Sequence, residues 1–150
     1  QHVVVWGGDR TVVESVAPDG SANVILADGP VATVPDGPTV PAPLGRVAGA
    51  RSGDKGGDAN LGVFVRDDAA WAWLDAYLTV DRLRQLLPEA ADLEVERHRL
   101  PALRSLNFVI RGLLGEGVAA STRQDGQAKS LGEWLRARTV DVPTSLLGTP

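Results

Sequence analysis

The residues from 51 to 60 form the densest group of chemically capable side chains in the sequence. Three glycines, two acids, two bases, a hydroxyl and an amide fall within these ten positions. In order, the residues are Arg51, Ser52, Gly53, Asp54, Lys55, Gly56, Gly57, Asp58, Ala59 and Asn60. Glycines let a ligand approach the backbone, so successive N–H groups can surround an anion while Arg51 and Lys55 add positive charge. We therefore predict a loop that binds a phosphate or a carboxylate.

The same residues allow other interpretations. Asp54, Asp58 and Asn60 offer oxygen ligands suited to a hard cation, but the set is incomplete, and we expect neither a metal nor another cofactor. Lys55 precedes the glycine pair, whereas a Walker A loop needs its lysine after a glycine, so a nucleotide triphosphatase is disfavoured. In a purely structural interpretation, Asp54 pairs with Lys55, Asp58 forms an Asx turn, and the glycines only turn the chain.

A second group of polar candidates lies further along the chain. Asn107 and Arg111 stand four apart in a segment that we expect to be helical, which would place both in one cleft. They could also form a plain polar face on which Arg111 favours the helix dipole. Lys129 precedes the last predicted helix, where it can reach an anion or stay solvated. His98 is expected on a strand surface, and His2 lies in another segment, so neither a histidine metal pair nor a catalytic triad has support.

Composition excludes several classes of function. The 150 residues carry 19 acids against 15 lysines and arginines, and this net charge of -4 gives no global positive field for nucleic acid or an anionic membrane. The sequence has no cysteine, which excludes disulfides and a cysteine nucleophile. It also lacks an apolar run of the ~18 residues that a membrane-spanning helix requires. We therefore expect a soluble, cytoplasmic protein.

The first 46 residues are expected to form two segments. Short β-branched runs at 3–6, 11–13 and 23–26 alternate with turn signals, which predicts a β-rich segment over 1–34. The prolines that follow are Pro35, Pro38, Pro41 and Pro43. Because proline removes a backbone donor and fixes φ, we expect neither a helix nor a central strand there, and we predict a semi-rigid linker over 35–46.

Residues 47–140 are expected to form one α+β domain, followed by a flexible tail over 141–150. In order, the predicted elements are strands at 47–50 and 61–65, a helix from 67, a strand from 93, a helix from 103, a strand at 118–122 and a helix at 129–138. Helices interleaved with few strands predict a two-layer sandwich, with the helices on one face of a mostly antiparallel or mixed sheet.

Two of these elements carry details that a structure can test. In the helix from 67, Trp71 and Trp73 do not share the apolar face, so one of them should be partly exposed. The segment from 103 keeps helical spacing of its apolar residues up to Gly115, which predicts a helix. Phe108 and Ile110 also suit a sheet, so a strand remains the open alternative for this segment.

Three blocks of the sequence, 50–63, 106–115 and 126–131, resemble the C-terminal ferredoxin-fold domain of the acyclic terpene utilisation protein AtuA. The blocks occur in the same order as in that family. The resemblance implies a ferredoxin-like α/β fold and membership of a group encoded with genes for breaking down acyclic terpenes, such as citronellol and geraniol, through their CoA thioesters. A larger domain precedes this one in the family, so we expect an AtuA-type large chain as a partner.

These observations support three hypotheses about function. The first is an accessory subunit that contributes the glycine-rich loop, together with Asn107, Arg111 and Lys129, to a shared site for an acyl-CoA ligand. The second is a free-standing lyase or hydratase in which Asp54 and Lys55 act as acid and base, which requires a dry pocket. The third is a structural module that covers an open sheet face by self-association.

Overall fold

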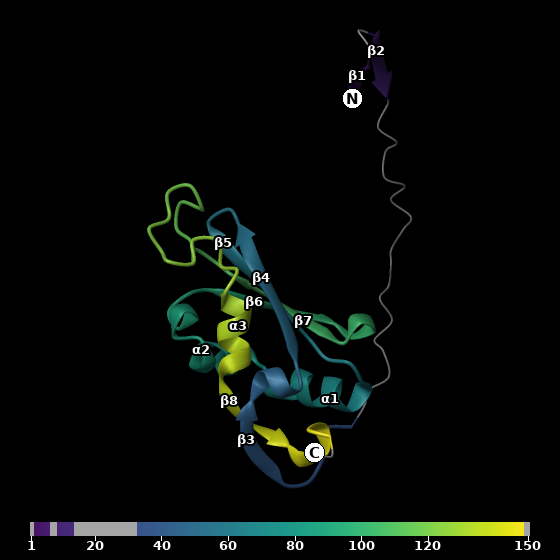
Figure 1. Cartoon of the computed structure of the whole chain (residues 1–150), viewed down its shortest axis with the longest axis vertical. Coiled ribbons are helices and arrows are strands. Elements are labelled where there is room, and N and C mark those ends of the chain that lie inside the picture. Colours follow the sequence, from purple (N-terminus) through teal and green to yellow (C-terminus); the bar gives the residue numbers. More distant parts are fainter. Residues whose placement is uncertain (1, 7–8, 14–32, 149–150) are drawn as a thin grey trace.

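The computed structural model describes residues 2–6, 9–13 and 33–148, and Figure 1 shows how its elements are arranged. Its centre is a four-stranded antiparallel sheet with the order β4-β5-β7-β6. The strands are β4 (Gly49–Lys55), β5 (Asp58–Phe64), β6 (Val95–Leu100) and β7 (Ser105–Ile110). The helices that accompany them are α1 (Asp68–Tyr77), α2 (Val80–Leu86) and α3 (Leu131–Ala137). The predicted α+β, ferredoxin-like class is confirmed.

Alternating side chains bury one face of this sheet. On β7, Leu106, Phe108 and Ile110 are fully buried, whereas Asn107 between them points to the other face. Helix α3 packs against β4 and β5. Helix α1 is tied to β6 by Arg97, whose guanidinium donates to carbonyls at the C-terminal end of α1. The helices therefore form a second layer on the buried face.

The segment from 103 forms a strand, and the helix predicted there is wrong. Its apolar residues fit both patterns, because Leu106 and Ile110 are four apart while Phe108 completes an alternation. In the structure β7 lies between β5 and β6 and pairs with both. Aromatic and β-branched side chains suit such a central strand. The alternative that the sequence left open is thus confirmed.

The stretch 51–60 is a β-hairpin, so the predicted loop is also wrong. Strand β4 continues to Lys55 and β5 begins at Asp58, which leaves Gly56 and Gly57 as the connection. Gly56 has a φ of 65°, which glycine adopts without strain in a two-residue hairpin turn. Successive N–H groups of a strand point in opposite directions. They therefore cannot converge on an anion in the way that we expected of a loop.

Parts of the predicted linker (35–46) and of the predicted flexible tail (141–150) pair with each other. Strands β3 (Thr39–Pro43) and β8 (Thr139–Pro143) form a two-stranded antiparallel sheet. The backbone hydrogen bonds at both ends of this pair involve even-numbered residues of the proline-rich segment. The odd-numbered prolines of β3 thus occupy positions whose N–H is not needed for pairing. Proline spacing, rather than proline content, permits this strand.

Helix α1 is buried more widely than we predicted. Asp67 caps it, accepting a backbone hydrogen bond at 2.8 Å. Trp71 and Trp73 are 6% and 5% exposed, so the prediction that one would be partly exposed is wrong. The β3–β8 sheet lies beside α1 in Figure 1. Burial raises the pKa of the Tyr77 phenol; the charge of Arg82 opposes this effect, and the negative charge of Asp141 on β8 adds to it.

The last predicted helix is present as α3, but the strand predicted before it is wrong. Residues 118–122 belong to a series of turns that follows β7. Gly112, Gly115 and Gly117 adopt positive φ values of 70°, 60° and 100° in or just before this region. Such values are incompatible with a regular strand, since strand residues have negative φ.

The N-terminal β runs at 3–6 and 11–13 form a separate hairpin. It consists of β1 (His2–Trp6) and β2 (Asp9–Val13), which pair antiparallel. The strand expected at 23–26 lies outside the described residues. No helix in the described part of the chain is long and apolar enough to cross a membrane.

Candidate functional site

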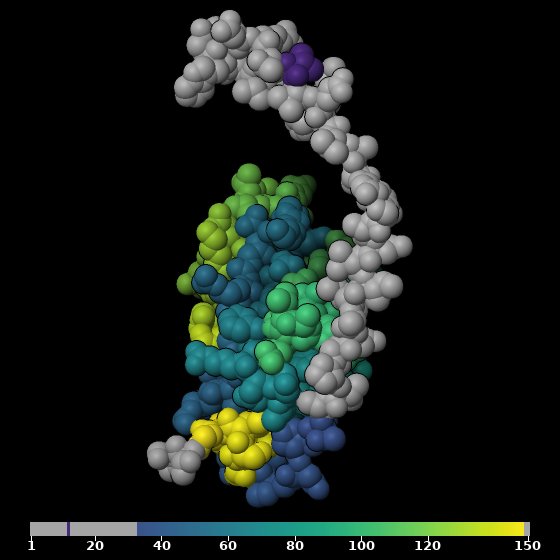
Figure 2. All heavy atoms as spheres, turned by 90° about the vertical axis from the view of Figure 1, so that its right-hand side faces the viewer, coloured from purple at the N-terminus to yellow at the C-terminus, as the bar shows by residue number. Residues whose placement is uncertain are grey.

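Most of the predicted site residues share the face of the sheet that lies opposite the helices. Paired residues of neighbouring strands point to the same face, and so do alternate residues of one strand. By this register the face carries Arg51, Gly53, Lys55, Asp58, Asn60, Asn107 and Arg111. Ser52 and Asp54 point to the helix side instead. Figure 2 shows atoms of β4 and β5, drawn in blue, reaching the surface without a helix in front of them.

Arg111 is held between two carboxylates on this face. Its Nη1 donates to Asp58 at 2.6 Å, and its Nε and Nη2 donate to Glu96 at 2.8 and 2.6 Å. The pKa of Asp58 is lowered by a hydrogen bond from the Gly112 N–H and then by Arg111, and Arg111 also lowers the pKa of Glu96. Two acids thus neutralise this guanidinium, which leaves it little charge for a ligand. Asp58 binds a distant N–H instead of forming a local Asx turn.

The glycine pair at the hairpin turn has a structural reason. The Gly57 carbonyl accepts a hydrogen bond from the Leu114 N–H at 2.8 Å. A Cβ added to Gly57 would lie too close to the carbonyl oxygen of Gly115 for the two segments to stay in place. Gly57 therefore allows the turn to pack against the segment after β7, and the positive φ of Gly56 accounts for the other glycine. The geometry thus explains both residues without a ligand.

Ser52 connects β4 to the start of α3. Its hydroxyl accepts the Gly132 N–H at 2.9 Å and lies 3.2 Å from the Lys129 carbonyl, to which it donates. Ser130, the residue at the N-cap position, makes no capping hydrogen bond of its own. Ser52, on β4, thus caps α3 although it lies 80 residues away from Gly132 in the sequence.

Replacing Ser52 by alanine should lower the free energy of unfolding by about 1 kcal/mol, because α3 loses a cap and a buried N–H loses its acceptor. Equilibrium unfolding in urea measures this loss. Ser121→Ala is the matched control, since the Ser121 hydroxyl accepts only a neighbouring N–H at 3.3 Å. Equal losses in the two variants would mean that the connection to α3 contributes no stability.

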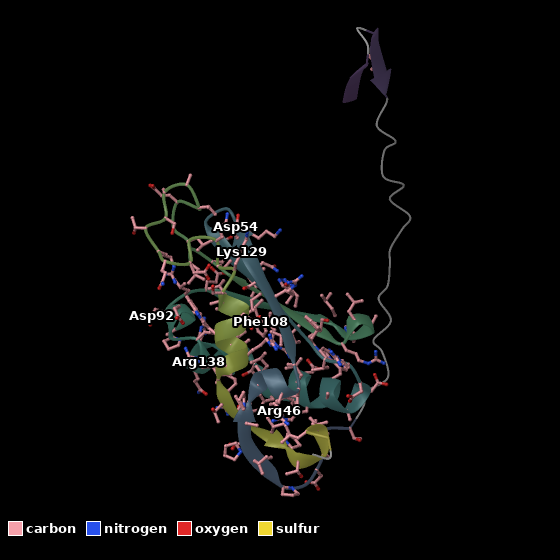
Figure 3. The ribbon with its side chains drawn as sticks, viewed as in Figure 1. Arg46, Asp54, Asp92, Phe108, Lys129 and Arg138 are labelled. Atoms are coloured by element: carbon pink, nitrogen blue, oxygen red, sulfur yellow. The ribbon has the colours of Figure 1, made fainter. Side chains whose placement is uncertain are left out.

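Three of the predicted cations gather along β4, which is an edge strand of the sheet. A cavity of about 290 Å³ is lined by Arg51, Ser52 and Lys129, and an adjoining cavity of about 220 Å³ by Arg51, Lys55 and Asn60. Figure 3 shows Lys129 near Asp54 at this end of the molecule. Arg51, Lys55 and Lys129 are exposed and form no ion pair with another described residue. We refer to Arg51, Lys55 and Lys129 as the β4 cation group.

Asp54 and Lys55 do not have the surroundings that acid–base catalysis requires. Both side chains are exposed at the end of β4. Within the described residues they form no ion pair with each other. A side chain that transfers protons to a substrate works in a dry pocket, where burial and charged neighbours tune it. The catalytic roles predicted for this pair therefore stay a prediction without support from the geometry.

The family of the chain follows from a comparison of its sequence with known families. Residues 42–141, two-thirds of the chain, match the AtuA ferredoxin-like domain. The chain belongs to this family. Membership associates the AtuA-like chain with AtuA-type proteins, and the match begins inside β3 and ends inside β8. Comparisons with curated proteins and with solved structures give no match.

Sequence reasoning missed several residues that position the site of the AtuA-like chain. Glu96 holds Arg111 on the open face, and Asp125 accepts the N–H groups of Lys129 and Ser130, both at 2.9 Å. Sequence spacing gives no signal for the contact between Glu96 and Arg111. The only signal for Asp125 is that it precedes Lys129 by four residues at a turn. The pairing of β6 with β7 brings Glu96 to Arg111.

Proposed function

We propose that this AtuA-like chain acts as an accessory subunit or domain of an AtuA-type large partner in the cytoplasmic breakdown of acyclic terpenes through their CoA thioesters. In this role the β4 cation group contacts a phosphate of CoA, and the partner supplies the reacting groups. Family membership supports the partner, and the exposed position of Asp54 and Lys55 favours an accessory role over a complete active site of its own.

The observation that carries the ligand proposal is that three cations without an ion-pair partner in the described part of the chain lie along one edge strand. Lysine and arginine bind phosphate oxygens through charge-assisted hydrogen bonds. Gly53 lies between Arg51 and Lys55, and a Cβ there would meet nothing within 4 Å. A glycine within a strand weakens it and often marks a place where a ligand approaches closely. Asn60 pairs with Gly53 across the strands and adds an amide to the same cavity.

Calorimetric titration of the chain with CoA, with its large partner present, tests this proposal. We expect Arg51→Ala combined with Lys129→Ala to weaken CoA binding at least ~10-fold, which corresponds to about 1.4 kcal/mol. The loss should be greatest at low salt, because exposed charges are screened as ionic strength rises.

Arg138→Ala is the control, since this exposed arginine follows α3 at the end away from Lys129 in Figure 3. Its CoA affinity should match that of the unaltered chain. If the double variant bound CoA as tightly as the unaltered chain, the role of the β4 cation group would be contradicted. Failure of the chain to co-elute with the large partner on a sizing column would contradict the accessory role.

A further inference from the structure

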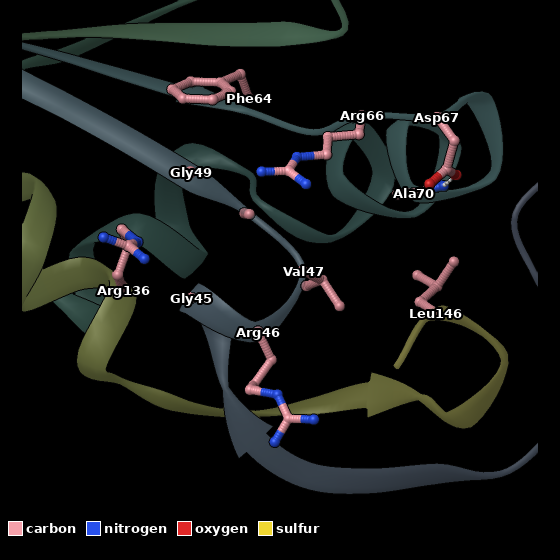
Figure 4. A pocket seen from close by; sticks show the side chains of 11 residues that line it. Gly45, Arg46, Val47, Gly49, Phe64, Arg66, Asp67, Ala70, Arg136 and Leu146 are labelled. Carbon is pink, nitrogen blue, oxygen red and sulfur yellow. Dashed lines mark hydrogen bonds between the residues drawn. The ribbon is translucent and has the colours of Figure 1, made fainter. Parts of the chain in front are cut away.

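A third cavity, of about 350 Å³, lies at the end of the sheet away from the hairpin turn. Figure 4 shows it where the start of β4, the end of β5, the start of α1 and the turn after β8 meet. None of the residues predicted as a site from the sequence lines it. The cavity therefore needs an interpretation of its own.

The charges that line this cavity are mostly positive. Arg46, Arg66 and Arg136 contribute to its wall together with a single acid, Asp67. The Asp67 carboxylate is already engaged as the N-cap of α1. Arg46 and Arg66 are exposed and have no hydrogen-bonding or ion-pair partner among residues 33–148. The cavity thus holds positive charge that its own walls do not neutralise.

Arg136 is only partly neutralised. Its Nη1 pairs with Glu133 of the same helix at 2.8 Å. Its Nε is buried and has no acceptor among the described residues. A Cβ added to Gly45 would lie 3.2 Å from the Arg136 Cβ, so glycine at 45 leaves room for this side chain beside the cavity.

The rest of the wall is apolar. Val47, Ala70 and Leu146 line it, together with the ring of Phe64. Phe64 is 42% exposed, and its ring lies over Gly49, where a Cβ would collide with it. In Figure 4 the Arg66 side chain lies to one side of Gly49 and Arg46 lies on the other side of Val47. A ligand in the cavity would therefore meet arginines and an apolar surface together.

We propose that this cavity binds a small amphipathic anion, whose carboxylate or phosphate is held by Arg66 and whose apolar part lies against Phe64, with Arg46 adding positive charge from the other side of Val47. Guanidinium groups recognise both kinds of anion through paired hydrogen bonds. A cavity of this size lies at the lower end of the range for small-molecule sites, which combine an apolar wall with a few polar groups. The site is separate from the β4 cation group and does not depend on the CoA proposal.

Titration of the full chain with hexanoate, hexyl phosphate and hexanol, followed by calorimetry, tests this site. At least one of the two anions should bind saturably, and hexanol should bind at least ~10-fold more weakly, since it has no charge for the arginines. Tighter binding of hexanoate identifies a carboxylate as the natural group. Tighter binding of hexyl phosphate identifies a phosphate.

Arg66→Ala should weaken binding of the anion about 10-fold, and Arg46→Ala should weaken it by a smaller factor, since Arg46 adds only charge from the other side of Val47. Both residues are exposed and have no partner among residues 33–148, so the variants should fold, which circular dichroism verifies. Phe64→Ala should also weaken binding, whereas Arg51→Ala should leave it unchanged. The proposal is overturned if no anion binds saturably, if hexanol binds as well as the anions, or if Arg66→Ala binds like the unaltered chain.

Discussion

Replacing Phe108 by alanine should lower the free energy of unfolding by about 3–5 kcal/mol, the range for removing a large aromatic side chain from a packed core. Phe108 is fully buried on β7, in the middle of the sheet and on the face that the helices cover. Domains of this kind are stable by only about 5–15 kcal/mol, so the variant would lose a large share of its stability. Urea unfolding followed by tryptophan fluorescence measures the change.

The chain offers a matched control for this substitution. Phe64 is its other phenylalanine and is 42% exposed on the opposite face of the neighbouring strand. Phe64→Ala should cost only about 1 kcal/mol, because its ring is 42% exposed and its removal loses less buried apolar surface. Similar losses in the two variants would contradict the assignment of the buried face. They would mean that the helices do not cover the side of β7 that carries Phe108.

The elements best predicted from the sequence are those whose local signals agree with their surroundings. The helix predicted from residue 67 is confirmed as α1, which begins after a capping aspartate. The strand predicted from residue 93 is confirmed as β6, with His98 on its surface. In β7 the local signals conflicted, and the choice depended on neighbouring strands that spacing within the segment does not reveal.

The largest error in the predicted fold has a single origin. Proline content suggested a linker before residue 47, and the final residues suggested a flexible tail. Their pairing joins residues about a hundred apart in sequence, for example Val40 with Val142. One unpredicted long-range pairing thus produced the errors in the linker and in the tail.

The candidate site shows the same division between local and long-range information. Residue types indicated correctly that charge gathers around β4, but the partners of each charge depend on the sheet register. Arg111 is predicted as a ligand group and is engaged by two acids, whereas Arg51 and Lys55 have no ion-pair partner among the described residues. The cavity lined by Arg46 and Arg66 lies outside every predicted motif. Arg46 lies at the end of the predicted linker, and Arg66 lies between a predicted strand and a predicted helix.

Asp75 is the charged residue of α1 with the most extensive ion pairing to the sheet. Its carboxylate accepts hydrogen bonds from Arg97 at 2.7 Å and from Arg99 at 2.6 Å, both on β6. The Asp75 and Arg97 side chains are 20% and 18% exposed, so water screens their pair only in part. Burial alone would raise the pKa of Asp75, but the hydrogen bonds from Arg99 and Arg97 outweigh it and hold the pKa below 3.8.

Asp75→Asn should therefore lower the free energy of unfolding by about 2 kcal/mol near neutral pH, less than for a fully buried pair and more than for a surface pair. Because the folded pKa is depressed, the stabilisation is present above the unfolded pKa and is lost as pH falls through the folded value. The difference between the two proteins should thus shrink below about pH 4. Urea unfolding across this pH range measures it.

Asp68→Asn is the control for this prediction. Asp68 also pairs with an arginine, Arg104, at 2.6 Å, but the two side chains are 56% and 40% exposed. Its loss should be under about 1 kcal/mol, as for other exposed pairs. A loss at Asp75 no larger than at Asp68, or a difference that grows on acidification, would show that the Asp75 pairs do not hold α1 against β6. The helix layer would then depend on its apolar contacts alone.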